Sequence, residues 1–171
     1  MIILAFDLGR ETGVAYGNVR DIPKFQTEFL GKAGSTQAAR FSQTLRMCNR
    51  LIEQIKPDAI VIEKPIAAGV VGKEARVQQA FGYRGCVFAM AQMKGIKPYE
   101  YSVQDIRGHM LGERNLKSEV AKPRAFEACK RLGWNPATYD ESDAGAVWHF
   151  ARMKIGGVTT LPGLFGDQLH G

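Results

Sequence analysis

Two pairs of acidic residues occupy positions where an ionised carboxylate needs a partner. Asp7 ends the apolar run "IILAFD", and Glu63 ends the apolar run "AIVIE". If the two runs are neighbouring buried strands, these carboxylates project from the same region, repel each other and resist burial. Neither run contains a lysine or an arginine that would neutralise them. A divalent cation would do so, and Mg²⁺ is bound by a few carboxylates together with substrate phosphates.

The second pair lies in the stretch "DESDAGAVWHF". Asp140 and Asp143 are three residues apart, so on a helix they share a face. The small residues 144–146 would let this helix approach a sheet closely, with Asp143 pointing towards it. Acidic residues also stabilise the first turn of any helix through its dipole, and Asp140 is a candidate N-cap. Asp7 has a similar structural alternative, because it can cap the turn "LGRET" that follows it.

Together the four acids could hold two divalent ions and support hydrolysis. Two ions a few ångströms apart stabilise the attacking and the leaving oxygen of a phosphodiester displacement, and one of them activates a water molecule. Such chemistry requires no side-chain nucleophile, and the histidines of the chain form no visible triad with a serine or cysteine. Asp7, Glu63, Asp140 and Asp143 are therefore candidate catalytic residues and ligands for Mg²⁺, for which we expect Mn²⁺ to substitute.

The spacing of apolar residues predicts the elements that must position these acids. Three strands form an antiparallel meander, and helices then alternate with a buried central strand and one further strand. The fold class is therefore α/β, with a five-stranded mixed sheet flanked by helices. Pro123 is expected to disturb the helix that contains it. The expected strands are Ile2–Leu8, Thr12–Gly17, about Lys24–Leu30, Ala59–Ile62 and 96–101, and the expected helices are Gln37–Lys56, Glu74–Lys94, Ser102–Leu111, Ser118–Leu132 and 140–154.

Composition narrows the class of protein further. A chain of 171 residues is expected to form one domain. Its net charge of +6 favours a polyanionic partner such as nucleic acid. The cysteines are widely spaced and form no Cys-x-x-Cys pair, which is typical of free thiols in a reducing compartment. Because no basic leader and no apolar run of membrane-spanning length is present, we expect a cytoplasmic protein without a membrane partner.

The acidic stretches also resemble a known family. In this order, "AFDLGRETGVAY", "AIVIEKP" and "DESDAGAVWHF" are similar to the three acidic motifs of RuvC-type Holliday-junction resolvases, which belong to the ribonuclease H-like (retroviral integrase) superfamily. The resemblance spans roughly residues 1–154. It implies a ribonuclease H-like nuclease domain over 1–155, followed by an irregular tail over 156–171. It also implies a homodimer that binds four-way or other branched DNA and makes paired, Mg²⁺-dependent nicks, with the four acids as metal ligands.

The same resemblance suggests where DNA and the second subunit bind. The stretch "YSVQDIRGHMLGERNLKSEVAK" is similar to the family's basic segment, so Arg107 and Lys117 are expected to hold phosphates. The predicted helix Glu74–Lys94 corresponds to the family's dimer interface, although ordinary core packing explains its apolar face equally well. The interface candidates on it are Val77, Phe81 and Phe88, with Gly82 and Gly85 allowing close approach, and the full set of expected DNA-binding residues is Lys64, Lys73, Arg76, Arg107, Arg114 and Lys117.

Two departures from the family pattern and three alternatives stay open. The loop "KPIAAGVVGKEAR" lacks the family's aromatic wedge, for which Ile66, Val70 or Val71 is a substitute, and the turn "DLGRET" suggests a divergent phage or prophage branch. The first alternative is a YqgF-like or other ribonuclease H-like nuclease acting on RNA or other branched nucleic acid. The second is an ATP-binding protein of the sugar-kinase, Hsp70 and actin superfamily, which "DLGRETG" also resembles. The third is a DNA-binding scaffold without catalytic activity.

Overall fold

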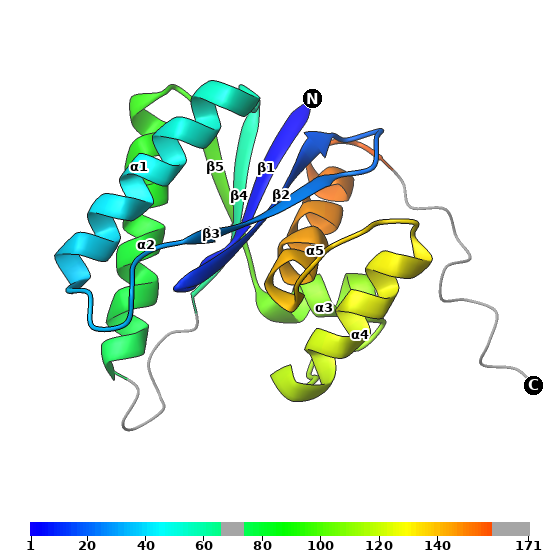
Figure 1. Ribbon diagram of the computed structural model, residues 1–171. Helices are drawn as coiled ribbons and strands as arrows, with labels where there is room; N and C mark the ends of the chain where they lie inside the picture. Colours follow the sequence, from blue (N-terminus) through cyan, green and yellow to red (C-terminus); the bar gives the residue numbers. More distant parts are fainter. Residues whose placement is uncertain (66–73, 159–171) are drawn as a thin grey trace, which may run out of the picture.

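A five-stranded mixed sheet forms the centre of the molecule, as the sequence predicts. The computed structural model describes residues 1–65 and 74–158 (Figure 1). Strands β1 (Ile2–Asp7), β2 (Glu11–Asn18) and β3 (Lys24–Phe29) form the antiparallel meander, and β4 (Ala59–Glu63) and β5 (Lys97–Tyr101) run parallel to β1. The strand order is β3-β2-β1-β4-β5, so the central strand β1 and its neighbour β4 are the ones that end in acids.

Helices cover both faces of this sheet. Helices α1 (Gln37–Ile55) and α2 (Glu74–Met93) lie on one face, and α3 (Val103–Leu111), α4 (Ser118–Arg131) and α5 (Tyr139–Lys154) lie on the other (Figure 1). Each face has its own apolar core, so β1 alternates between them: Leu4 and Phe6 pack towards α1 and α2, whereas Ile3 and Ala5 pack towards α5. Burial on both faces explains why β1 and β4 are continuous apolar runs.

Helix α5 lies unusually close to the sheet, and glycine makes this possible. It packs against β1, β2, β3 and β4. Gly13 on β2 faces the backbone of the first turn of α5, where no side chain would fit. One turn further along, a Cβ atom at Gly145 would lie 3.0 Å from the ring of Phe25. The predicted role of the small residues after Asp143 therefore agrees with the observed packing.

Two local expectations are wrong. Asp140 is not the N-cap of α5, because Thr138 holds that position and its Oγ1 accepts a hydrogen bond of 3.1 Å from the amide of Glu141. Pro123 does not interrupt α4, which continues through it. The proline removes one amide donor, and the carbonyl it would have reached belongs to Glu119, an exposed residue in the first turn where water can replace the bond.

The face of α2 that the sequence singles out divides between core and surface. Phe88 is partly buried against the core that includes Tyr83 and Val87, whereas Phe81 is 43% exposed. Gly82 does allow a close approach, but the neighbour is the ring of Phe41 on α1 of the same chain. A Cβ atom at Gly85 would meet nothing within 4 Å in the protomer. The exposed strip of this helix therefore includes Phe81 and Gly85.

Candidate active site

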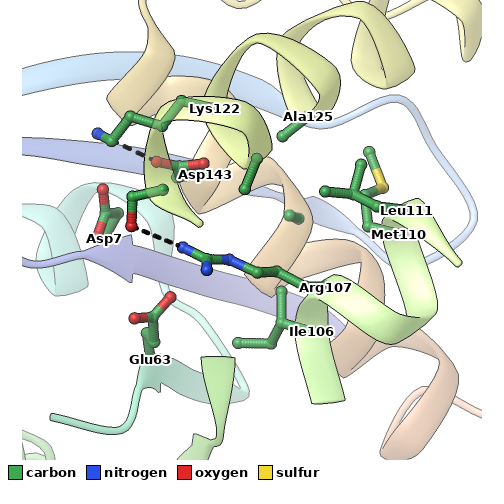
Figure 2. A pocket seen from close by; sticks show the side chains of 12 residues that line it. Asp7, Glu63, Ile106, Arg107, Met110, Leu111, Lys122, Ala125 and Asp143 are labelled. Carbon is green, nitrogen blue, oxygen red and sulfur yellow. Dashed lines mark hydrogen bonds and ion pairs between the residues drawn. The ribbon is translucent and has the colours of Figure 1, made fainter. Parts of the chain in front are cut away.

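A pocket opens where β1 and β4 end, beneath α3, α4 and α5. Phe6 of β1 pairs with Ile62 of β4, so the acids that follow them, Asp7 and Glu63, occupy matching positions on adjacent parallel strands. Their side chains enter the same pocket (Figure 2), which has a volume of about 140 Å³. The charged side chains that line it are Asp7, Glu63, Arg107, Lys122 and Asp143.

Three of the four predicted metal ligands form a tight cluster. Asp7, Asp140 and Asp143 each offer a carboxylate oxygen, and these ligand atoms all lie within 4.8 Å of one another. Glu63 is not part of that set, but it lines the pocket with Asp7 and Asp143. Convergent carboxylate oxygens in a half-buried pocket are the hard donors that Mg²⁺ and Mn²⁺ prefer. The residues present therefore fit a divalent ion.

Burial and mutual repulsion make this pocket unfavourable for ionised acids on their own. Burial raises the pKa of Asp7 well above its usual value, and the charges of Asp143 and Glu63 raise it further. The pKa of Glu63 rises to about 7, first through burial and then through Asp143. Burial also raises the pKa of Asp143, although Lys122 acts in the opposite direction. Such shifts are typical of functional sites, because the fold holds like charges together until a cation neutralises them.

Lys122 is the charged pocket residue that sequence reasoning missed. Its Nζ lies 2.8 Å from Asp140 Oδ1 and 3.2 Å from Asp143 Oδ2. Burial acts to lower the pKa of Lys122, but the hydrogen bond that Lys122 donates to Asp140 and the charges of Asp143 and Asp7 outweigh it and raise that pKa. A signal was present in the sequence, because Lys122 follows Ala121 on the small-residue face by which α4 packs against α5. A lysine on such a face points towards the neighbouring element.

Arg107 is the predicted DNA-binding residue that the fold brings into the pocket. It extends from α3 towards the acids (Figure 2). One guanidinium nitrogen donates to Ser118 Oγ at 3.1 Å, and the other donates to the carbonyl of Leu116. These bonds hold the guanidinium in place while its charge acts to lower the pKa of Glu63, against the larger effect of burial. Arg107 is thus a fixed cation beside the acid cluster.

The other predicted DNA-binding residues lie around the pocket or away from it. Lys64 is exposed directly after Glu63, and Lys117 is exposed directly before α4. Arg76 is exposed on the first turn of α2. Arg114 is also exposed, but it pairs with Asp105 at 2.7 Å and lines a separate hollow beside α5. Lys73 and the candidate wedge residues Ile66, Val70 and Val71 lie outside the described residues.

A second hollow, of about 830 Å³, lies at the same end of the sheet as the acids. It runs between the β1–β2 turn, the end of β3 and helix α1, and three cations line it: Arg10, Lys32 and Arg46. Phe29, which is largely exposed, borders it and pairs in register with Glu11. Because the three cations come from separate parts of the chain, sequence spacing alone contains no signal that they share one groove.

Comparison with solved structures identifies the architecture. The structure of Thermus thermophilus RuvC matches 91% of this chain and 97% of its own, with a TM-score of 0.65 at 16% identity. The match to the complex of that RuvC with a Holliday junction substrate covers 91% of this chain and 96% of the RuvC chain, with a TM-score of 0.67 at 14% identity. The match to the yeast mitochondrial Holliday junction resolvase covers 86% of this chain and 76% of the resolvase chain, with a TM-score of 0.61 at 12% identity. Fold and site thus define a ribonuclease H-like domain with an acidic centre.

Sequence comparison then narrows the class to a family. No family model matches the chain. The crossover junction endodeoxyribonuclease RuvC of Pseudoalteromonas atlantica is 32% identical over 153 residues, which cover 85% of this chain and 83% of that protein. RuvC of Chlorobium phaeovibrioides is 25% identical over 167 residues, covering 92% and 84%. The chain belongs to the RuvC family of crossover junction endodeoxyribonucleases.

None of the helices in the described part of the chain combines the length and the apolar character that a membrane crossing demands.

Proposed function

We propose that this protein is a structure-selective endodeoxyribonuclease that resolves Holliday junctions by paired phosphodiester cleavage. The observation that carries the proposal is the acid cluster at the ends of β1 and β4 in a chain of the RuvC family. Its relatives are crossover junction endodeoxyribonucleases, and the Thermus thermophilus RuvC has been seen with a Holliday junction substrate. Resolution of such junctions places the protein in DNA recombination and repair.

The acids are the proposed catalytic residues and metal ligands. Asp7, Asp140 and Asp143 supply the convergent oxygens, and Glu63 faces them from the neighbouring strand end. Two Mg²⁺ or Mn²⁺ ions bound there would supply this chemistry: one would activate a water molecule at neutral pH, and the other would stabilise charge on the leaving oxygen. Arg107 contributes a fixed positive charge beside the acids, which attracts and orients the phosphate to be cut. No histidine or serine nucleophile is required.

Basic residues on both sides of the pocket are the proposed path of the DNA backbone. Lys64 and Lys117 are exposed beside the pocket. On the other side, the groove with Arg10, Lys32 and Arg46 lies at the same end of the sheet. Phosphate contacts of this kind give affinity without sequence preference, and they explain how a chain with a net charge of +6 holds an extended anion.

A homodimer is the proposed active form. A four-way junction offers two symmetry-related strands for cleavage, and a two-fold dimer supplies two active sites through one repeated interface. The exposed strip of α2, with Phe81 and the open Gly85, is the proposed seam. Val77 and Phe88 are only partly buried beside it. An exposed aromatic side chain with partly buried apolar neighbours on the same helix fits the centre of an interface, where aromatic residues are enriched.

Cleavage assays on a panel of nucleic acids test the proposal. Synthetic four-way junctions, Y-forks, linear duplex and structured RNA are incubated with and without Mg²⁺. We expect paired nicks in four-way junctions, only with the metal ion, and little cleavage of duplex or RNA. Preferential cleavage of RNA, or single uncoordinated nicks in branched DNA, would instead favour the YqgF-like alternative. Metal-independent binding without any cleavage would favour a scaffold.

A further inference from the structure

Lys122 stands out because its ammonium group forms ion pairs with two of the proposed metal ligands. Nζ lies 2.8 Å from Asp140 Oδ1 and 3.2 Å from Asp143 Oδ2, and Figure 2 shows it above the carboxylate of Asp143. Both acids belong to the set whose ligand atoms converge with that of Asp7. An oxygen that accepts a hydrogen bond from the ammonium is not free to bind an ion until the ammonium moves away.

We propose that Lys122 is a built-in counter-ion that competes with the divalent cation for Asp140 and Asp143, and so sets the cation concentration that the site requires. The inference rests on the proposed function, of which it names a regulating residue. It assigns Lys122 a positioning role towards the acids and no part in the bond-breaking step.

The side chain of Lys122 is suited to leave when a cation arrives. Ala121 and Ala125 are buried on the inner face of α4, so the helix that bears Lys122 is held by packing. The lysine side chain is itself 38% exposed, and its four-carbon stem is flexible. The ammonium can therefore turn towards solvent while the backbone of α4 stays in place.

Arg107 cannot take over this role. Arg107 and Lys122 are the cations among the described residues that line the pocket. The guanidinium of Arg107 is held by Ser118 and by the carbonyl of Leu116, and it makes no ion pair with Asp140 or Asp143 within the described structure. Without Lys122, the acid cluster would lack its directly bound counter-charge, which is costly for half-buried carboxylates.

Two other roles for Lys122 make different predictions. If Lys122 only stabilised the fold by pairing with Asp140, its loss would lower stability and leave the affinity for cations unchanged. If it served as a phosphate contact, its loss would weaken junction binding with no change in the affinity for cations. Competition instead predicts that loss of Lys122 strengthens cation binding, because removal of the ammonium leaves the acids free to attract the divalent cation.

Binding of Mn²⁺ by the DNA-free protein, measured from the free-ion signal in electron paramagnetic resonance, separates these roles. Lys122→Met keeps the apolar stem without the charge, and Lys122→Arg keeps the charge. Lys130→Met is the matched control, because Lys130 is an exposed lysine on the same helix, about 12 Å further along it. Thermal unfolding in the chelator EDTA and in saturating Mn²⁺ provides a second readout.

Competition predicts that Lys122→Met lowers the Kd for Mn²⁺ at least about tenfold, with Lys122→Arg and Lys130→Met within about threefold of the wild type. In EDTA, Lys122→Met should unfold at a lower temperature than the wild type, and saturating Mn²⁺ should remove this difference. An unchanged or weaker affinity in Lys122→Met would overturn the role. If that variant does not fold in EDTA, Lys122→Gln carries the same prediction, because its amide donates to Asp140 without a charge.

The outcome for the wild type separates this inference from the proposed function. If the wild type binds Mn²⁺ and the Lys122 variants bind it equally well, the counter-ion role is wrong and the metal site stands. If the wild type binds no Mn²⁺, the metal site and the role of Lys122 are both overturned.

Discussion

A Cβ atom on Gly13 would lie 1.8 Å from the backbone carbonyl oxygen of Asp140. Gly13 pairs with Asp7 across β1 and β2, so the glycine that admits the first turn of α5 is the register partner of the first acid. The separation of Asp7 from Asp140 and Asp143 therefore depends on a position that carries no functional group. Any side chain at Gly13 would move α5 and pull the acid cluster apart.

Gly13→Ala is expected to lower the free energy of unfolding and to abolish cleavage together. Overpacking against a flexible neighbour costs about 1–3 kcal/mol, and here the neighbour is backbone, so we expect at least the upper end of that range. Gly145→Ala is the matched variant, since its Cβ would meet the ring of Phe25 at 3.0 Å and helix propensity would offset part of the cost. Denaturant unfolding and junction cleavage should show Gly13→Ala far more impaired than Gly145→Ala.

Loss of single acids should separate chemistry from binding. Asp7→Asn, Glu63→Gln and Asp143→Asn are each expected to reduce cleavage by at least about 50-fold while junction affinity is retained, because the cations supply that affinity. In EDTA, Asp7→Asn should also raise the unfolding temperature, since burial and neighbouring acids raise the pKa of Asp7.

The exposed Glu127→Gln on α4 is the control for these variants, with wild-type cleavage expected. More than a few per cent of wild-type activity in Asp7→Asn would contradict its assignment as a metal ligand. Asp140→Asn belongs in the same series, and Thr138 rather than Asp140 caps α5, so its effect would report on the cluster and not on a lost cap.

The salt dependence of junction binding should identify phosphate contacts on both sides of the pocket. Each phosphate contact that is lost lowers the slope of log affinity against log salt by about one. We expect this for Arg107→Ala and Lys117→Ala beside the acids, and for Arg46→Ala in the neighbouring groove. Arg20 is exposed on the turn after β2, at the opposite end of the sheet, and Arg20→Ala should leave the slope unchanged. If Arg107→Ala, Lys117→Ala and Arg46→Ala all kept the wild-type slope, the DNA would bind elsewhere.

A buried histidine should make the protein sensitive to mild acid. Burial lowers the pKa of His149 to about 3, and the positive charge of Arg152 and the neighbouring His109 act in the same direction. The unfolded chain binds a proton at His149 below about pH 6.5, whereas the folded chain does not, so stability falls as pH decreases from there. Each pH unit costs about 1.4 kcal/mol, or about 2–3 kcal/mol by pH 4.5.

Denaturant unfolding of the wild type and of His149→Gln at pH 7 and pH 4.5 measures this effect. The raised pKa values of Asp7 and Glu63 act in the opposite direction, because the folded state binds their protons more tightly. The comparison of the two proteins cancels that contribution. If His149→Gln loses as much stability in acid as the wild type does, His149 is not the sensitive group.

The sheet and the acids could be predicted from sequence because their signals are local. Asp7 and Glu63 each end an apolar run, and the alternation of strands and helices indicates a mixed sheet. The Arg10–Arg46 groove could not be predicted in the same way, since it depends on how α1 packs beside the end of β3 and the β1–β2 turn. For Lys122 the small-residue face of α4 was a signal, but its contact with the acids depends on how α4 packs against α5. Thr138 displaced Asp140 as the cap because a hydroxyl two residues earlier reached the amide of Glu141.

The α2 surface should decide the state of assembly, and the structure now distinguishes its two phenylalanines. Phe81 is 43% exposed, whereas Phe88 packs on the core and lies 4.3 Å from the guanidinium of Arg84. Phe81→Asp should therefore yield a folded monomer that has lost coordinated paired nicking, because an interface anchor is removed at a cost of about 2 kcal/mol or more. Phe88→Asp should lower stability as well. Sedimentation with junction DNA measures the assembly. Met93, at the end of α2, is 78% exposed, and Met93→Asp tests how far the seam extends. A wild type that stays monomeric on junction DNA would contradict the dimer and favour a nuclease that makes single cuts.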